Sequence, residues 1–492
     1  MLIFVQNILN FLLFIPLIGI FILLFIPFQK KLLLKQIALF FSSIAFNFSL
    51  LLWLTFDKSL GSFQNTSKIF WLPFLNINIH LGIDGISLFF LILTTLLIYI
   101  CLLASWISIY HDVKYYLIFF LLMEFFLIGV FCVLDLLLFY IFFECVLIPM
   151  FFIIGVWGSR ERKIRAAYFF FFFTLSGSAL MLLAVIYIYY QTGTTNFEIL
   201  LTISLTKKEQ LLLWIGFFLS FASKVPMIPF HVWLPEAHVE ASTTGSVILA
   251  GILLKLGTYG LLRFLFPLFP FACFFFSPLV YSLSVIGILY ASITAIRQSD
   301  FKRIIAYTSI AHMNLVIVGL FSFHLISIEG AILQSISHGF VSSALFLLIG
   351  VVYDRYHTRM IKYYGGLTHI MPIYIILFLF FTLANIGFPG TSNFIGEFLI
   401  LLGSFTVNIP ITVFSSISMI LGGCYSLWLF NRIAYGNLKT QYLNFYIFDL
   451  SNREIYYFNP LIICTFFFGI YPEIFLDYIH LSTQLIIEYI DI

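Results

Sequence analysis

The sequence predicts an all-α polytopic membrane protein with about fourteen transmembrane helices. Of its 492 residues, 62% are hydrophobic and only 9% are charged, whereas about a quarter of the residues in an average soluble protein carry a charge. The 24 basic and 21 acidic side chains are too few to cover the surface of a water-soluble protein of this length. Soluble enzymes, coiled coils and disordered chains are therefore excluded.

Long apolar segments supply the individual helices, because a bilayer core needs about 20 apolar residues per span. Dividing these segments at charged residues, Pro and Gly predicts helices over residues 2–27, 34–56, 85–107, 115–133, 135–156, 165–190, 210–234, 243–266, 273–296, 303–323, 329–353, 372–402, 409–434 and 457–476. Connections after odd-numbered helices hold seventeen Lys and Arg, and those after even-numbered helices hold five. The positive-inside rule then places the basic connections on the matrix or cytoplasmic side and both termini outside.

Six ionisable residues within the predicted helices are singled out as candidate functional residues. They are Glu124 in helix four, Asp135 and Glu144 in helix five, Lys224 in helix seven, Lys255 in helix eight and Glu397 in helix twelve. Each costs about 2.5–3.5 kcal/mol at mid-membrane on insertion scales. Such residues persist where they are paired, neutralised or in contact with water, which predicts an ion or proton path. Structural ion pairing is the alternative for both lysines and Glu397, and snorkelling is the alternative for Glu124 and Asp135.

Two of the helices that carry these charges are interrupted by proline. Lys224 stands just before Pro226, and Glu397 follows Pro389. Proline removes a backbone donor and frees a carbonyl one turn earlier, and in hydrocarbon the freed groups need protein or water partners. Interrupted helices at corresponding places of two halves are typical of transporters built from internal repeats.

A pair between Glu144 and Lys224 would allow a small helix movement to switch a proton. Two charges about 4 Å apart attract by roughly 4 kcal/mol at an effective dielectric constant near 20. The pair would hold Lys224 protonated, and separation in a desolvated site would release its proton. His312 and His338, in helices ten and eleven, are candidate relays because imidazole titrates near neutral pH. A structural histidine bonded to a neighbouring helix is the alternative for each.

The sequence offers no framework for a metal or redox centre. Its six cysteines are scattered, without a C-x-x-C spacing, so iron–sulfur, zinc and c-type haem sites are not expected. Glu236, His238 and Glu240 lie close together, but a packed or solvated interhelical loop is the favoured interpretation over a metal site. The net charge of +3 gives no reason to expect a nucleic-acid partner. The N-terminal apolar segment fits neither a cleaved signal nor a transit peptide, so a mitochondrial protein with this sequence would be made inside the organelle.

Seven segments together carry a family resemblance. They are residues 81–88 (LGIDGISL), 143–149 (FECVLIP), 224–241 (KVPMIPFHVWLPEAHVEA), 251–260 (GILLKLGTYG), 309–314 (SIAHMN), 337–344 (SHGFVSSA) and 389–398 (PGTSNFIGEF). With them the sequence resembles the antiporter-like subunits of respiratory complex I over nearly its whole length. The helix-twelve ionisable residue is usually Lys in the family's chains 2 and 5, so Glu397 points to another branch. One departure is Ser242, which stands where the family usually has Pro and should loosen the start of helix eight.

The resemblance implies two inverted five-helix repeats with discontinuous helices seven and twelve. The repeats would cover residues 113–268 and 269–436, between an N-terminal three-helix segment (1–112) and a last helix with its tail (437–492). A hydrated polar axis would cross the middle of the membrane. Its implied members are Glu144 and Lys224 as the coupling pair, Lys255 as the central relay, Glu397 as the distal proton site, His312 and His338 as bridges, and Glu124 as the acidic residue of helix four. Asp135 is a further relay candidate from its position alone.

The resemblance also implies a function. The chain would translocate protons in the inner mitochondrial membrane, coupled to NADH:ubiquinone electron transfer, with both termini on the intermembrane-space side. It would hold no cofactor, and FMN and the iron–sulfur clusters would lie in partner subunits. The expected partners are other membrane-arm subunits, especially the adjacent antiporter-like chains 2 and 5, and membrane lipids such as cardiolipin. A cation/proton antiporter subunit, a passive scaffold and a membrane cytochrome are the alternatives.

Overall fold

The computed structural model describes residues 2–72, 76–439 and 448–491. The chain divides into two compact units, of which the first comprises Met1–Val225, Ile252–Pro278 and Asp477–Ile492, and the second comprises Pro226–Gly251 and Leu279–Leu476. The chain passes from one unit to the other inside both repeats that the sequence predicts. The predicted repeat boundaries therefore do not coincide with these units and stay a prediction.

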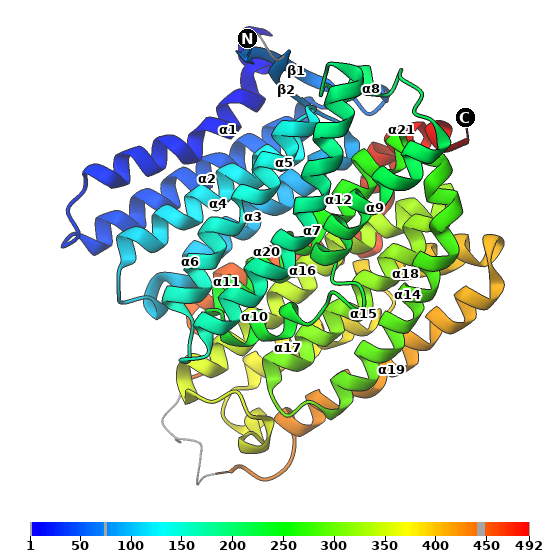
Figure 1. Ribbon diagram of the computed structural model, residues 1–492. Coiled ribbons are helices and arrows are strands. Elements are labelled where there is room, and N and C mark those ends of the chain that lie inside the picture. Colours follow the sequence, from blue (N-terminus) through cyan, green and yellow to red (C-terminus); the bar gives the residue numbers. More distant parts are fainter. Residues whose placement is uncertain (1, 73–75, 440–447, 492) are drawn as a thin grey trace. The chain divides into compact units, whose positions relative to one another are not determined.

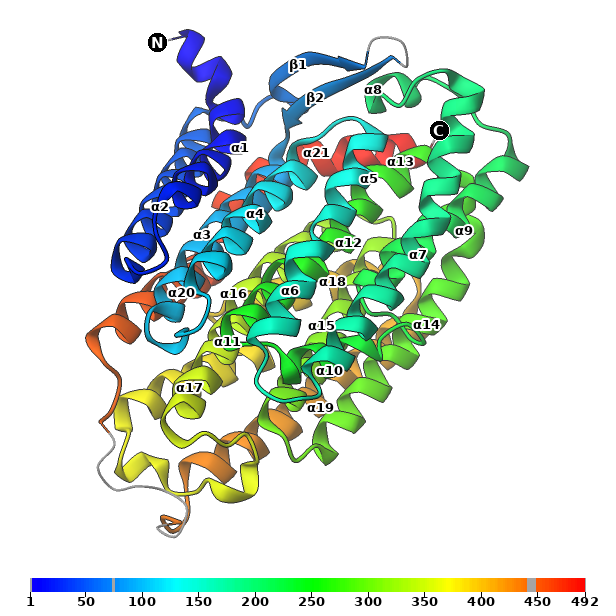
Figure 2. The same ribbon diagram turned by 60° about the vertical axis from the view of Figure 1, so that its left-hand side comes forward.

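The first unit combines long helices with a short hairpin. It contains α1 (Leu2–Phe25), α2 (Lys31–Thr55), β1 (Gln64–Leu72), β2 (Ile77–Ile83), α3 (Gly85–Ser108), α4 (Val113–Cys132), α5 (Leu136–Cys145), α6 (Leu147–Trp157), α7 (Lys163–Thr192), α8 (Phe197–Leu200), α9 (Lys207–Lys224), α12 (Leu254–Gly260), the π-helical η3 (Leu261–Leu265) and α13 (Phe266–Leu268). Helices α1 to α4 lie side by side, and α7 packs along α9 (Figures 1 and 2). Three elements have residues in both units, namely η2 (Leu249–Leu253), α14 (Pro270–Arg297) and α21 (Glu473–Asp491).

The regular elements of the second unit, over its described residues, are all helices. They are α10 (Trp233–Glu240), α11 (Thr243–Ile248), α15 (Phe301–Phe321), α16 (Leu325–Tyr356), η4 (Ile361–Tyr363), η5 (Leu367–His369), α17 (Pro372–Ile386), α18 (Ser392–Val407), α19 (Ile409–Ala434) and α20 (Asn452–Ile470). Helix α16 is buried along most of its length, and both α15 and α18 pack against it (Figure 1).

Each of the fourteen predicted ranges contains helix, which confirms a polytopic helical membrane protein. Within the described part of the chain, eleven helices are long and apolar enough to cross a membrane, or twelve if α20 and α21 count as one broken span. Predicted helices seven and twelve are not among them because both are split. The helix ending at Lys224 resumes at Trp233, and the helix ending at Ile386 resumes at Ser392. The exact count of fourteen crossings therefore stays a prediction.

The segment that joins α2 to α3 adds a short β-hairpin, which the sequence did not predict, to the predicted helical fold. Strands β1 and β2 pair there in antiparallel register, with Ser67 opposite Leu81 and Ile69 opposite Ile79. The hairpin lies beside α1 (Figure 2). Its Ile and aromatic residues have high β propensity, but each strand is too short to be recognised among membrane helices by hydropathy.

The start of α3 is fastened to α21. Asp84 caps α3, with Ser87 N donating to Asp84 Oδ1 at 2.9 Å and Asp84 N donating to the Ser87 hydroxyl at 2.9 Å. Gly85 N donates to Ser482 Oγ at 3.2 Å. A Cβ atom at Gly85 would overlap the backbone carbonyl oxygen of Tyr478, so only glycine permits this approach. The sequence predicts a tail after the last membrane helix, but α21 in this tail packs on α3.

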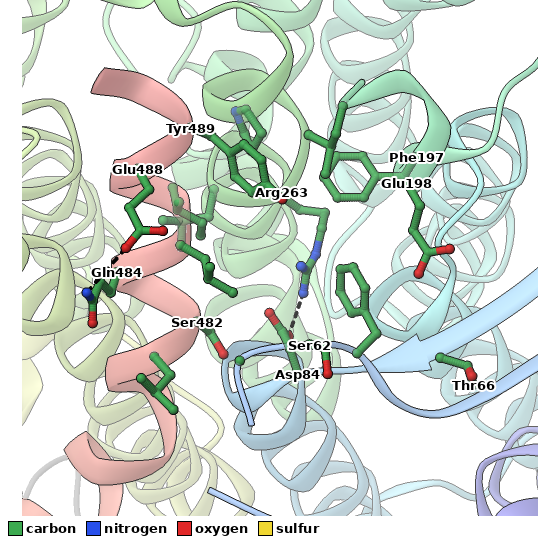
Figure 3. Close-up of a pocket in the computed structure, with 18 of the residues that line it drawn as sticks. Ser62, Thr66, Asp84, Phe197, Glu198, Arg263, Ser482, Gln484, Glu488 and Tyr489 are labelled. Carbon is green, nitrogen blue, oxygen red and sulfur yellow. Dashed lines mark hydrogen bonds and ion pairs between the residues drawn. The ribbon is translucent and has the colours of Figure 1, made fainter. Parts of the chain in front are cut away.

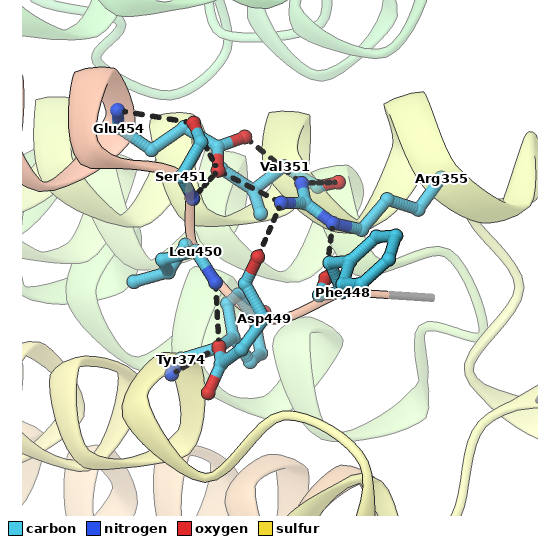
Figure 4. Close-up of polar contacts among 8 residues, drawn as sticks. All are labelled: Val351, Arg355, Tyr374, Phe448, Asp449, Leu450, Ser451 and Glu454. Carbon is cyan, nitrogen blue, oxygen red and sulfur yellow. Dashed lines mark hydrogen bonds and ion pairs between the residues drawn. The ribbon is translucent and has the colours of Figure 1, made fainter. Parts of the chain in front are cut away.

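A polar network joins three helices of the second unit (Figure 4). The Arg355 guanidinium donates to both carboxylate oxygens of Glu454, at 2.9 and 2.8 Å, and to the carbonyl of Asp449 at 3.1 Å. The Asp449 carboxylate in turn accepts from Ile373 N and Tyr374 N at the start of α17. Bidentate Arg–carboxylate pairs are strong and fix geometry. Arg355, counted in the sequence as a connection cation, therefore ties α16 to the beginnings of α17 and α20.

Candidate functional site

The last residue of α9 is the buried Lys224. Its Nζ lies 3.6 Å from Glu144 Oε1 and donates to the carbonyl oxygen of Phe143 at 2.7 Å. The centroid of the Phe143 ring is 3.2 Å from the same nitrogen. The partial negative charge at a helix C-terminus adds to the stabilisation of a cation. The predicted contact between Glu144 and Lys224 is therefore present, while its role in proton transfer stays a prediction.

Lys255 lies in α12, which packs against the last turns of α9. Its side chain is 0% exposed. A Cβ atom at Gly257 would be 2.9 Å from the Phe221 carbonyl oxygen and would overlap the Val225 side chain. Glycine thus lets the two helices approach closely and holds Lys255 next to the end of α9. The π-helical segments η2 and η3 flank α12, and such bulges are frequent at functional sites.

Two other predicted relay residues occupy different environments in the first unit. Glu124 is fully buried in α4, and neither carboxylate oxygen has a hydrogen-bond partner among the described residues. Asp135 caps α5, because its Oδ1 accepts from Leu137 N at 3.0 Å and Leu138 N at 3.1 Å. Its Oδ2 accepts from the Thr195 hydroxyl at 2.6 Å. These contacts explain Asp135 as a helix cap, and its relay role stays a prediction.

Substitution of Asp135 separates capping from proton transfer. We expect Asp135→Ala to destabilise the protein by about 1 kcal/mol through loss of the N-cap, visible as a lower apparent Tm of the purified assembly. Asp135→Asn keeps a capping oxygen and removes the group that could take up a proton. Because the contacts of Asp135 are those of a helix cap, we expect this variant to preserve both the Tm and proton transfer. Normal stability but lost proton transfer in Asp135→Asn would instead identify a relay.

The second unit contains a cluster around Glu397. The Oε1 atom of Glu397 lies 3.1 Å from His312 Nδ1 and accepts a hydrogen bond from Gln334 Nε2 at 3.1 Å. The rings of His312 and His338 have centroids 5.7 Å apart. All four side chains are buried. The structure thus brings together the three predicted residues of this unit and adds Gln334, which nothing in the sequence singled out.

Glycines explain how α16, α17 and α18 approach this carboxylate. Gly387 ends α17 with φ +81°, and a Cβ atom there would lie 2.8 Å from Glu397 Oε2. A Cβ atom at Gly396 would lie 2.6 Å from Gln334 Oε1, and one at Gly330 would lie 2.8 Å from the Ile400 nitrogen. Small residues allow membrane helices to pack backbone to backbone. The glycines therefore make room for the Glu397 and Gln334 side chains.

The structure corrects the assignment of Arg263 to a connection between helices. This residue was assigned to the connection after helix eight, but it lies inside η3, is 6% exposed and forms a 2.5 Å ion pair with Asp84 Oδ1. The position of Arg263 within a continuous apolar segment could have indicated that its side chain is buried. Its partner could not be found from spacing because the two residues lie 179 positions apart.

The acidic residues near His238 form ion pairs. Glu236 pairs with Arg303 at 2.6 Å, and Glu240 Oε1 lies 3.7 Å from the buried Arg359 guanidinium. The His238 ring stacks on Phe346 with centroids 4.7 Å apart. Among the described residues, no group of three or more His, Cys, Asp or Glu is arranged to hold a metal ion. These pairs account for the two carboxylates without a metal.

Ser242, the departure from the family pattern, caps the next helix. Its hydroxyl oxygen accepts from Gly245 N at 3.2 Å at the start of α11. A serine N-cap contributes about 1 kcal/mol relative to alanine. This cap compensates for the loss of the rigidity that a proline would provide at the same position.

Comparisons with known proteins agree with this arrangement. Residues 133–422 match the family model described as NADH:quinone oxidoreductase/Mrp antiporter, TM. The NADH-ubiquinone oxidoreductase chain 4 of Chondrus crispus is 58% identical over 96% of both chains, and that of Arabidopsis thaliana is 56% identical over 96% of both. A chain of respiratory complex I from Thermus thermophilus with bound NADH superposes with a TM-score of 0.89 at 28% identity, covering 99% of each chain.

The family model covers more than half of the chain, and these relatives match it almost from end to end. The interrupted helices and the charges buried beside their breaks lie within the matched residues. The chain belongs to the NADH:quinone oxidoreductase/Mrp antiporter family of membrane proteins, in the branch of the NADH-ubiquinone oxidoreductase chain 4 proteins.

Proposed function

We propose that this chain is a proton-translocating membrane-arm subunit of respiratory complex I in the inner mitochondrial membrane. Proton movement through it is coupled to NADH:ubiquinone electron transfer in the other subunits. Its termini face the intermembrane space. FMN and the iron–sulfur clusters belong to partner subunits, the neighbours are the antiporter-like chains 2 and 5, and lipids such as cardiolipin surround it.

One observation carries the proposal, namely that each unit buries titratable side chains beside the break in a discontinuous helix. In the first unit, Lys224 at the end of α9 meets Glu144. In the second unit, Glu397 one turn into α18 meets His312. In a protein that only anchored neighbouring subunits, these buried charges would raise the free energy of the folded state without contributing to function.

The contacts of Lys224 suggest how a proton is held and released. A carboxylate, a carbonyl oxygen and an aromatic face all surround its amine, and all three favour the ammonium form. If the end of α9 withdraws from Glu144, the buried charge loses its main compensation, and desolvation then favours release of the proton. Lys255 on the adjoining α12 is the acceptor in the first unit.

The cluster in the second unit supplies a second place for a proton. The Glu397 carboxylate and the His312 imidazole can share one proton over 3.1 Å, and Gln334 keeps the carboxylate oriented by donating its amide hydrogen. His338 extends the polar path from His312. Histidine suits this role because its two ring nitrogens can take up and release protons at opposite ends.

The family description also covers Mrp antiporters, so a cation/proton antiporter subunit is the second candidate. Purification in mild detergent separates the two. We expect this chain to co-purify with NADH-oxidising polypeptides, and the isolated assembly, reconstituted in liposomes, to acidify the vesicle interior when NADH is oxidised. Sodium-dependent proton flux without electron transfer, in an assembly lacking NADH oxidation, would favour the antiporter instead.

A further inference from the structure

An apolar groove of about 200 Å³ lies between α6 and α7 in the first unit. Three side chains of each helix line it, namely Ile148, Phe151, Phe152, Tyr168, Phe171 and Phe172. Phe151 joins the two walls, because its ring centroid lies 5.4 Å from that of Tyr168 and 5.8 Å from that of Phe171. Phe152 and Phe172 are 40% and 60% exposed. Since both helices belong to membrane spans, the groove opens toward lipid chains or toward a neighbouring subunit.

The connection from α6 to α7 adds a basic end to this groove. Residues 160–165, which form the connection and the first turn of α7, contain four cations and one carboxylate. Arg160, Arg162 and Arg165 are exposed, so a ligand can reach their guanidinium groups. Helix α7 also begins without a side-chain cap, and the positive end of its dipole therefore faces the same connection. Guanidinium groups bind phosphate through paired hydrogen bonds, so this end of the groove suits a phosphate group.

The basic end and the apolar wall are in line along α7. Arg165, Tyr168 and Phe172 follow one another at spacings of three and four residues, so they lie on one face of the helix. The helix rises about 10 Å from Arg165 to Phe172, and the aromatic wall therefore extends from the guanidinium into the hydrocarbon layer. A phospholipid has the same order of parts, with its phosphate at the membrane surface and its acyl chains beneath.

The width of the groove favours an acyl chain over a protein segment. At roughly 30 Å³ for a group about as large as a water molecule, a volume of about 200 Å³ holds about six or seven methylene groups of one chain. An α-helix with its side chains is about 10 Å across and would contact only the rim.

The larger cavity of the first unit has the opposite charge (Figure 3). This cavity of about 790 Å³ is lined by the carboxylates of Asp84, Glu198 and Glu488. Its single basic lining residue, Arg263, is already paired with Asp84 at 2.5 Å. An anionic lipid would be repelled there, so the charges of the first unit favour the groove between α6 and α7 as the site for such a lipid.

We propose that the groove between α6 and α7 binds one anionic phospholipid. The phosphate lies against Arg160, Arg162 and Arg165, and one acyl chain lies between the aromatic walls. A zwitterionic lipid offers the same phosphate, but the cation of its headgroup is repelled by the three arginines, so a lipid with a net negative charge binds in preference. The site depends on the membrane fold alone and not on the proposed proton translocation.

The test uses the intact complex in phosphatidylcholine nanodiscs that contain a photoreactive lipid with a diazirine on its acyl chain. The photoreactive lipid is either phosphatidylglycerol or phosphatidylcholine, and mass spectrometry measures labelling of the six groove residues. We expect at least about fivefold more labelling by the phosphatidylglycerol probe, because a single Lys or Arg near an anionic lipid surface contributes about fivefold to binding. Changing Arg160, Arg162 and Arg165 together to Gln should make labelling by the two probes equal.

Lys207→Gln combined with Lys208→Gln is the matched control for the loss of cations. Lys207 also lies beside an aromatic ring, with its Nζ 5.0 Å from the centroid of Phe271, but it stands at the start of α9 and does not line the groove. We expect this variant to keep the preference for phosphatidylglycerol at the groove. High salt should reduce the preference in the unchanged protein, because the Debye length falls to about 3 Å at 1 M ionic strength.

A preference for phosphatidylglycerol that is lost in the arginine variant and kept in the lysine variant supports the lipid site. Equal labelling by both probes in the unchanged protein would identify ordinary surrounding lipid and overturn the proposal. Labelling by neither probe would show that a protein neighbour fills the groove, and loss of the preference in both variants would attribute it to overall charge; each result overturns the proposal. Proton pumping is measured separately, so failure of this site leaves the proposed function standing.

Discussion

Replacing Lys224 with alanine is expected to abolish most proton pumping while the complex still assembles. The amine lies 3.6 Å from Glu144, where the attraction amounts to roughly 4–5 kcal/mol at an effective dielectric constant near 20. Removing one member of a buried ion pair leaves the other charge uncompensated, which costs about 3–5 kcal/mol. Glu144 would then lack the cation that lies beside it. Proton pumping by reconstituted complex, normalised to the amount assembled, measures the loss.

Lys224→Arg distinguishes a proton switch from a structural ion pair. Arginine keeps a positive charge for Glu144, but it does not release its proton in proteins. If Lys224 must deprotonate, Lys224→Arg should assemble normally and pump as poorly as Lys224→Ala. If the pair only holds α9 in place, arginine should restore much of the pumping, and the proposed switch would be wrong.

Lys114 offers a matched control for these variants. It too is a buried lysine, with Nζ donating to the carbonyl oxygens of Leu24 and Ile26 at 2.8 and 2.9 Å. We expect Lys114→Ala to lower stability through the two lost hydrogen bonds and to leave the number of protons pumped per NADH unchanged. An equal pumping defect in Lys114→Ala would attribute the Lys224 effect to general destabilisation.

Replacing Glu397 with glutamine is expected to have the second large effect, at least about tenfold on the pumping rate. Glutamine preserves the shape and an acceptor for Gln334, but it can neither carry a charge nor pass a proton. Glu397→Asp keeps a carboxyl group at a shorter reach and should retain partial activity. Equal effects of the two substitutions would identify Glu397 as a structural residue.

The contact with His312 makes a double-mutant cycle informative here. If the carboxylate and the imidazole share a proton over 3.1 Å, adding His312→Gln to Glu397→Gln should cost little beyond either change alone, because residues in one network are not additive. Glu329 carries another carboxyl group of the same unit, near the start of α16. Glu329→Gln is therefore the control for the loss of an acidic side chain. Independent, additive effects of the two changes would place His312 outside the path.

Much of the fold and part of the site could be predicted because they depend on local properties of the chain. An apolar helix in lipid satisfies its own backbone hydrogen bonds, so its location is legible in a window of about 20 residues. A charge in such a window, as at Lys224, Lys255 and Glu397, stands out for the same reason. The hairpin of β1 and β2 was missed because β pairing depends on a partner strand rather than on local hydropathy.

The sequence by itself determined that the chain is a helical membrane protein and showed which helices are broken. It also showed which charged side chains are too costly to face lipid. Only the tertiary structure decided which of these side chains meet. It joined Glu397 to His312 and Gln334, Arg263 to Asp84, and showed Asp135 to be a helix cap. The physical reason is that burial costs are set residue by residue, whereas a hydrogen bond or ion pair requires two groups brought within about 3–4 Å, often from distant helices whose approach depends on glycines and packing.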